Sequence, residues 1–197
     1  MLDKYKNLDF LCINDVKCDY TSEYEPTINE FITNINSKLK WVPARVFSSR
    51  KNKNGLLTFI CIKDERDSCG NGPLNIFVMN PDVKSQIFLR EKYNDVPYLE
   101  AQIYSDHVEI INIFSVIHDV SYEGFGYGTM MLKALEKIAF DTHRYKIEGR
   151  LSEYDAQTED EKERRNGFYE ARGYTLIFND EFGKSGKTEK ILEKEVK

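Results

Sequence analysis

The sequence lacks a concentrated basic segment. Its 197 residues hold 28 Lys and Arg against 33 Asp and Glu, a formal net charge of -5, and the two signs are interspersed along the polar stretches. A nucleic-acid-binding surface needs basic residues gathered on one face. We therefore expect no nucleic-acid partner.

Long apolar runs are also missing. The longest aliphatic runs, Leu56 to Ile62 and Val108 to Ile117, are too short to span a bilayer, which takes about 20 residues. The charged segment Met1 to Lys6 has no apolar stretch of signal-peptide quality behind it. We expect a soluble, cytoplasmic protein with no membrane partner. A chain of this length can form one good core, so residues 1–197 are predicted to make a single domain.

Cysteines are few and irregularly placed. The four are Cys12, Cys18, Cys61 and Cys69, with no Cys-x-x-Cys pair and no histidine at zinc-finger distance. The favoured interpretation is therefore that the cysteines are reduced and either pack in the core or have no functional role. Nothing in the sequence calls for a metal.

Hydrophobic periodicity predicts alternating strands and helices. Strands are expected at Leu8–Asn14, Ala44–Ser48, Leu56–Ile62, Tyr98–Tyr104, Val108–Ile117, Tyr145–Leu151, Tyr174–Phe178 and Thr188–Val196. A charged helix is the alternative for the last of these segments. Helices are expected at Pro26–Trp41, Gly126–Phe140 and Glu159–Arg172. Residues 63–96 look like an elaboration, with a short strand at Ile76–Met79 and a short helix at Val83–Tyr93.

Two of these elements support sharper expectations. Val108 to Ile117 is apolar on nearly both faces, which is typical of a central strand covered by helices. In the last helix, Asp160 with Arg164 and Glu161 with Arg165 are predicted i,i+4 ion pairs. Gly173 is placed to cap the end of that helix.

Three alternating glycines occur in Glu123-Gly124-Phe125-Gly126-Tyr127-Gly128, between the apolar run and a predicted helix. Glycine permits positive φ and close ligand approach, and a helix start offers unpaired N–H groups and a positive dipole end. Such a loop suits an anion, most often phosphate. The spacing excludes a dinucleotide fingerprint, because the third glycine comes one residue early. Gly183-Lys184-Ser185 is not a P-loop, since Phe178 stands where the upstream glycine is required.

A second motif follows about forty residues later. Phe168-Tyr169 is followed by Gly173-Tyr174, where a helix closes and a strand opens. The glycine loop and this motif together resemble the two signatures of the Gcn5-related N-acetyltransferases, from about Tyr98 to Phe178. The first position departs from the pattern, because Glu123 stands where the family prefers Arg or Gln. The resemblance implies an α/β (α+β) fold with a mixed, mostly antiparallel sheet, helices on both faces and a splayed central strand.

The resemblance also implies acetyl-CoA as the cosubstrate. In the family, the loop and helix start hold the pyrophosphate, and the pantetheine arm inserts beside the splayed strand. Carried across, the implied pyrophosphate residues are Glu123, Gly124, Phe125, Gly126, Tyr127, Gly128 and Thr129. The implied pantetheine contacts are Val116 and Ile117. The connection after Ile117 is slightly longer than usual, which suggests a bulge.

Amide formation needs a neutral amine and a stabilised leaving thiolate. The resemblance assigns the proton donor to Tyr169, and a buried core aromatic is the alternative. Glu109 is the first candidate base, since alternation places it on the same face as Ile111 and Ile113. Glu100, His118 or a water chain are alternatives.

These features predict an N-acetyltransferase that moves an acetyl group from acetyl-CoA to an amine by direct attack in a ternary complex. A non-catalytic acyl-CoA-binding module and a structural protein with a glycine turn are the rival hypotheses. The acidic balance favours a cationic acceptor, such as a polyamine, an aminoglycoside or a protein amino group. A homodimer is left open.

Overall fold

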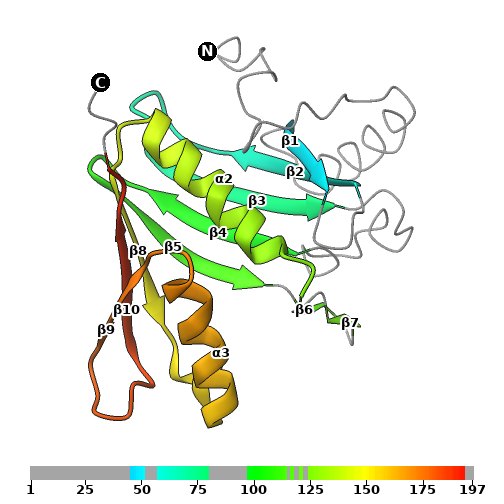
Figure 1. Ribbon diagram of the computed structural model, residues 1–197. Coiled ribbons are helices and arrows are strands. Elements are labelled where there is room, and N and C mark those ends of the chain that lie inside the picture. The colour runs from blue at the N-terminus through cyan, green and yellow to red at the C-terminus, as the bar shows by residue number, and fades with distance from the viewer. Residues whose placement is uncertain are drawn as a thin grey trace.

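The protein is described here by a computed structural model, which covers residues 45–51, 57–79, 97–114, 116–117, 120–121 and 124–193. Within these ranges, eight strands form one sheet in the order β1-β2-β3-β4-β5-β8-β10-β9 (Figure 1). The strands are β1 (Arg45–Lys51), β2 (Leu57–Asp64), β3 (Gly72–Met79), β4 (Tyr98–Ile103), β5 (His107–Phe114), β8 (Lys146–Leu151), β9 (Thr175–Phe178) and β10 (Gly186–Ile191). A separate pair consists of β6 (Val116–Ile117) and β7 (Val120–Ser121). The helices are α2 (Tyr127–Asp141), α3 (Glu159–Glu170) and the 3-10 turn η6 (Glu153–Ala156).

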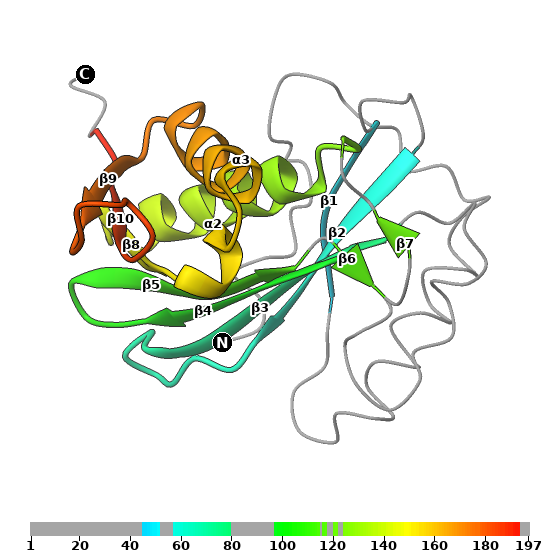
Figure 2. The same cartoon turned by 90° about the horizontal axis from the view of Figure 1, so that it is seen from below.

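The sheet is mostly antiparallel. Its one parallel pair is β5 with β8, the strands of this sheet that come before and after α2 in the sequence. The predicted mixed α/β fold class is therefore confirmed. The helices α2 and α3 lie on the same side of β3, β4 and β5 (Figure 2). The predicted strand Leu8–Asn14 and the predicted helices Pro26–Trp41 and Val83–Tyr93 lie outside the described residues.

The helix α2 crosses the sheet and supplies most of one side of the core. Its apolar residues recur at helical spacing, and Met131, Leu135 and Ile138 are buried. They pack with the inward side chains of the neighbouring strands, such as Leu99 and Ile147. The predicted helices after residue 124 and strands after residue 97 are confirmed within a few residues, apart from the ends of the long apolar strand and of the last strand, which stops at Ile191.

The strand β3 lies inside the sheet, between β2 and β4. Sequence patterns predicted only its second half, Ile76 to Met79, because Gly72 and Pro73 at its start have low strand propensity. Its buried residues Leu74, Ile76 and Val78 alternate toward the core.

The strand β5 is not buried on both faces, which corrects the expectation from its apolar sequence. Ile111 is 50% exposed and Phe114 is 44% exposed. A register shift explains the change: Ala101 pairs with Ile110 but Glu100 pairs with Asn112, so Ile111 is an extra, bulged residue. This bulge lies within β5, whereas the connection after Ile117, where the sequence suggested one, lies partly outside the described residues.

Next to this bulge, β5 and β8 separate. They pair only from His107 with Lys146 to Ile110 with Gly149, although both strands continue further. Figure 1 shows the two arrows diverging beyond this point. The central strand is therefore splayed from its parallel neighbour, as predicted.

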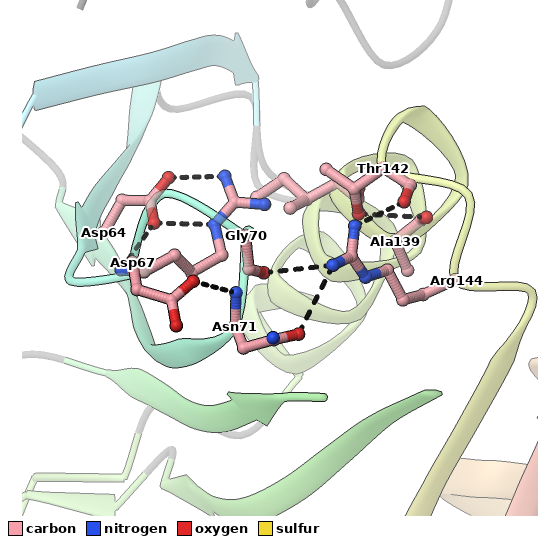
Figure 3. A network of polar contacts seen from close by, with 9 residues as sticks. Asp64, Asp67, Gly70, Asn71, Ala139, Thr142 and Arg144 are labelled. Atoms are coloured by element: carbon pink, nitrogen blue, oxygen red, sulfur yellow. Dashed lines mark hydrogen bonds and ion pairs between the residues drawn. The ribbon is translucent and has the colours of Figure 1, made fainter. Parts of the chain in front are cut away.

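Arg144, just after α2, joins three parts of the fold, and Figure 3 shows its contacts with Gly70 and Asn71. Its guanidinium donates to the backbone oxygens of Thr142 at 2.6 Å and Tyr104 at 3.1 Å. It also donates to Cys69 O at 3.2 Å, Gly70 O at 3.3 Å and Asn71 Oδ1 at 3.4 Å in the β2–β3 loop. One side chain thus joins the helix end to two separate turns. No helix in this described part of the chain is long and apolar enough to cross a membrane.

We expect Arg144→Met to lower the free energy of unfolding by about 2 kcal/mol, because a set of charge-assisted hydrogen bonds is lost while the apolar stem is kept. Urea unfolding followed by circular dichroism measures the change. Lys187→Met is the control, because Lys187 is 46% exposed with an ion pair at 3.5 Å to Glu189 and such pairs contribute little. Equal stability of the two variants would show that water replaces these bonds without loss.

Candidate functional site

A cavity of about 810 Å³ lies where β5 and β8 diverge. The start of α2, the end of β5, the end of β8, η6 and one side of α3 surround it. Its lining consists of Ile110, Ile111, Asn112, Ile113, Phe114, Gly124, Gly126, Tyr127, Gly128, Thr129, Arg150, Ser152, Tyr154, Asp155, Glu161, Arg164, Arg165, Phe168, Tyr169 and Arg172. Four arginines against two carboxylates make the lining cationic in a protein whose net charge is -5.

The three glycines of the loop meet different physical requirements. Gly124 and Gly126 have φ of +81° and +83°, a region that other residues rarely adopt. Gly128 is helical, and a Cβ there would lie 2.8 Å from Cε2 of Phe168. The third glycine therefore lets α3 approach the first turn of α2.

The N-terminus of α2 opens into the cavity without a side-chain cap. Gly126 is the N-cap residue, no side-chain cap hydrogen bond is present among the described residues, and the first turn contains no acidic residue. The first helical hydrogen bond runs from Met130 N to Gly126 O at 3.0 Å. The amides of Gly128 and Thr129 thus precede the hydrogen-bonded part of the helix, at the positive end of its dipole. This arrangement is suited to an anion.

Arg172 adds a cation to the same helix start. Its guanidinium lies 4.1 Å over the Phe168 ring and donates to Thr129 Oγ1 through Nε at 2.9 Å and through Nη2. Its Nη1 donates to Phe168 O. Burial lowers the pKa of Arg172, and nearby Glu136 acts against this shift. Since Thr129 Oγ1 accepts both bonds, its own O–H remains available to donate to a ligand.

Arg165 has a different role from Arg172, because its guanidinium binds backbone oxygens of two loops. It donates to Ser152 O and Lys184 O at 2.7 Å and to Gly183 O at 2.8 Å. The predicted Glu161–Arg165 ion pair is therefore wrong. The Glu161 carboxylate instead accepts from Thr158 N at 2.9 Å in a capping box, which fixes the start of α3.

Tyr169 is 9% exposed and lines the cavity from α3. Its ring packs edge-on against Phe168 at 5.1 Å and Tyr174 at 5.7 Å. Burial raises the pKa of Tyr169 to about 12, and the Asp155 carboxylate adds to the shift. Among the described residues, its hydroxyl makes no hydrogen bond. The Tyr169 hydroxyl is therefore a neutral hydrogen-bond donor at the cavity, and no described residue accepts its bond.

Five residues of β5, from Ile110 to Phe114, form the wall on the strand side. The bulge leaves Ile111 outside the ladder with β4. Beyond Ile110 the strand no longer pairs with β8, so its backbone groups on that side face the widening gap. The predicted contacts Val116 and Ile117 form β6, just beyond this wall, and pair with β7. Glu123 lies outside the described residues.

The loop residues predicted beside the glycines fall into two groups. Phe125 is half-buried, and Tyr127 is 1% exposed within the core. Their rings lie 5.6 Å apart. Tyr127 therefore faces the cavity through its backbone while its ring anchors the loop.

The side chain of Glu109 is on the face of the sheet opposite the one that packs against α2. It pairs with Gln102, whereas Ile113 pairs with core residue Leu99. The predicted shared face with Ile113 is therefore wrong, because the bulge shifts the alternation. Glu109 does not line the cavity, but its Oε1 lies 3.7 Å from Nε of Arg150, which does. Tyr104 also donates to it at 3.3 Å.

The other candidates for the base are Glu100 and His118. Glu100 accepts a hydrogen bond from Asn112 Nδ2 at 2.7 Å, on the same side as Glu109. His118 lies outside the described residues. Lys162, one turn into α3, is held by Glu159 at 2.7 Å and by Phe182 O at 3.1 Å.

Sequence patterns missed the cationic side of the cavity. Glu161, Arg164, Arg165, Phe168 and Arg172 follow one another at helical spacing on and just after α3. Within α3, the only large apolar residues are Phe168 and Tyr169, and this pattern could have been recognised in the sequence. Such a helix covers something polar rather than the centre of the core.

Comparisons with known proteins add solved structures to these observations. No family model matches the sequence, and no match was found among the curated proteins. The PaiA N-acetyltransferase of Thermoplasma acidophilum in complex with coenzyme A is 15% identical, with a TM-score of 0.42. The alignment covers 61% of this chain and 61% of that one, so this chain spans less than two thirds of the length of PaiA.

Two other solved structures show similar values. Naa50 of Arabidopsis thaliana, in complex with the bisubstrate analogue CoA-Ac-MVNAL, is 14% identical over 59% of this chain and 71% of that one, with a TM-score of 0.40. A nourseothricin acetyltransferase is 9% identical over 81% of this chain and 94% of that one, with a TM-score of 0.43. Similarities at this level assign no substrate or activity to this chain.

Proposed function

We propose that this chain is an acetyl-CoA-dependent N-acetyltransferase of the Gcn5-related type. The observation that carries the proposal is the uncapped N-terminus of α2, which opens into a cationic cavity beside the splayed strand β5. A helix start with free amides accepts phosphate oxygens. A cavity of this size beside a splayed, bulged strand suits the arm that joins a pyrophosphate to a thioester.

The proposed coenzyme pose follows the lining from one end to the other. The pyrophosphate lies on the loop and first turn from Gly124 to Thr129, with Glu123 at the start of the same loop. Positive φ at Gly124 and Gly126 brings the backbone close to it. The pantetheine amides pair with backbone groups of β5 near Ile111 and continue toward Val116 and Ile117. The thioester then lies near Tyr169.

In the proposed reaction, the amine nitrogen attacks the acetyl carbonyl carbon, the C–S bond breaks, and its electron pair goes to sulfur. A thiol has an ordinary pKa near about 8.5. Because the pKa of Tyr169 is raised to about 12, full proton transfer from the phenol to the thiolate is unfavourable. We infer that Tyr169 stabilises the sulfur charge as a hydrogen-bond donor. The proton that the amine loses passes to the base or to water and is then returned to the thiolate, so the products are the amide and the free thiol of CoA.

Glu109 remains the proposed base. Glu109 is on the side of the sheet opposite α2, and it contacts Arg150, which lines the cavity. An acceptor that enters from that side would meet Glu109 and Glu100 before it meets the thioester. Two carboxylates on that side of the sheet favour a cationic amine. A Glu109→Gln variant with wild-type turnover at neutral pH would move the base role to Glu100, His118 or water.

Acetyl-CoA binding and thiol release together test the proposed function. We expect calorimetry to detect acetyl-CoA binding, and we expect thiol to be released only when an amine from a panel of polyamines, aminoglycosides and peptides is added. Omission of the amine is the control for hydrolysis. Binding without turnover on any amine would favour an acyl-CoA-binding module. Absence of binding would leave the glycine loop as a structural turn.

A further inference from the structure

A second cavity, of about 350 Å³, lies beside the first one. Its lining consists of Thr129, Leu132, Lys133, Glu136, Ala171, Arg172 and Lys190. Thr129 and Arg172 line both cavities. The two spaces therefore meet at the Thr129–Arg172 hydrogen bond, just outside the first turn of α2.

The second cavity carries an excess of positive charge. Its cations are Lys133, Arg172 and Lys190, and its one carboxylate is Glu136. Lys190 neutralises that carboxylate, with Nζ 2.9 Å from Glu136 Oε1. Arg172 uses three of its five N–H groups on Thr129 and Phe168. Two cationic groups thus remain without a counter-charge in the cavity.

Lys133 is the informative member of this group. It projects from α2 one turn after Thr129, and it makes no hydrogen bond or ion pair within the described residues. By contrast, Lys137, one turn further on, pairs with Asp141 at 2.5 Å, and Lys146 pairs with Glu148 at 2.6 Å. An unpartnered lysine beside a half-buried arginine is suited to an anionic ligand.

We propose that Lys133, Arg172 and Lys190 form a subsite for the 3′-phosphate of CoA. The inference rests on the proposed function, because it takes the pyrophosphate to lie on the first turn of α2. In CoA, the 3′-phosphate and the pyrophosphate are attached to the same ribose. A ligand whose pyrophosphate meets Gly128 and Thr129 therefore brings the 3′-phosphate to an adjoining space, and the adjoining cationic space is this cavity. The subsite distinguishes CoA from 3′-dephospho-CoA.

Calorimetry with CoA and 3′-dephospho-CoA at one ionic strength tests this subsite. We expect the wild-type protein to bind CoA about tenfold more tightly, the effect of one charge-assisted contact that is partly screened by solvent. Lys133→Gln should reduce this preference to about twofold by weakening CoA binding, and should leave the affinity for 3′-dephospho-CoA unchanged. The thermal midpoint of the variant is measured alongside and should be unchanged, because Lys133 makes no hydrogen bond or ion pair among the described residues.

Lys137→Gln is the matched control, since Lys137 lies on the same helix but outside both cavities. It should leave both affinities unchanged. Equal wild-type affinity for CoA and 3′-dephospho-CoA would overturn the subsite and leave the proposed function intact. An equal loss of both affinities in Lys133→Gln would also overturn it. If neither ligand binds the wild-type protein, the proposed function fails, and the subsite fails with it.

Discussion

A Gly126→Asp variant is expected to bind CoA about 100-fold more weakly than a Gly126→Asn variant. Gly126 is the N-cap residue of α2 and has φ of +83° and ψ of 10°. Asn and Asp tolerate this left-handed region better than other residues, and both are good N-cap residues. The two side chains have nearly the same shape, so the comparison isolates one negative charge.

The size of this effect follows from the position of the charge. A carboxylate about 5 Å from a phosphate, at an effective dielectric constant of about 20, raises the free energy of binding by about 3 kcal/mol, or roughly 100-fold in affinity. Calorimetry on both variants measures the difference. The Gly126→Asp variant should nevertheless be the more stable of the two toward unfolding, because a carboxylate at a helix N-terminus is favourable. Equal CoA affinity of the two variants would place the pyrophosphate away from α2.

Local patterns in the sequence were enough to predict the parts of the site that depend on neighbours along the chain. The helix from about Gly126, the loop before it and the positive φ of Gly173, +76° in the structure, depend on short-range sterics and hydrogen bonds. The apolar stripe of α2 depends on a helical period. These features can be predicted because each is determined within a few residues.

Features that depend on distant residues were missed. Gly128 is needed because Phe168, forty residues later, occupies the space of a Cβ. The bulge at Ile111 depends on register with β4, and no periodicity in β5 alone reveals it. The exposure of Ile111 and Phe114 has the same cause, since apolarity predicts burial but a cavity wall also attracts apolar residues.

Arg172 shows why the cationic residues of the site were overlooked. In the sequence it is one of several charged residues at a helix end, where cations are common. In the structure its guanidinium stacks on Phe168 and bonds Thr129, which lies 43 residues earlier. Arg165 looks equally functional in sequence, yet it bonds backbone oxygens of two loops. Only side-chain geometry separates these two roles.

Replacement of Tyr169 with Phe is expected to lower kcat about 100-fold and to leave the CoA dissociation constant unchanged. Loss of one donor to a developing charge in a buried site has an effect of this size. Tyr174→Phe is the control, because Tyr174 is also buried, at 3% exposed, but does not line the cavity. It should leave kcat within about twofold, which is under about 0.5 kcal/mol. Steady-state thiol release and calorimetry measure both quantities.

The raised pKa of Tyr169 makes the same variant testable without substrate. A group whose pKa is raised on folding stabilises the fold fully below its unfolded pKa, near about 10, and this stabilisation is lost as pH rises toward about 12. Between these pH values, wild-type stability should therefore fall more steeply than that of Tyr169→Phe. At neutral pH the hydroxyl has no partner to lose among the described residues, so the two proteins should unfold at the same temperature. A large loss of stability in Tyr169→Phe together with an unchanged kcat would mean that Tyr169 is a core aromatic, and the hydrogen bond to sulfur would then have to come from another group.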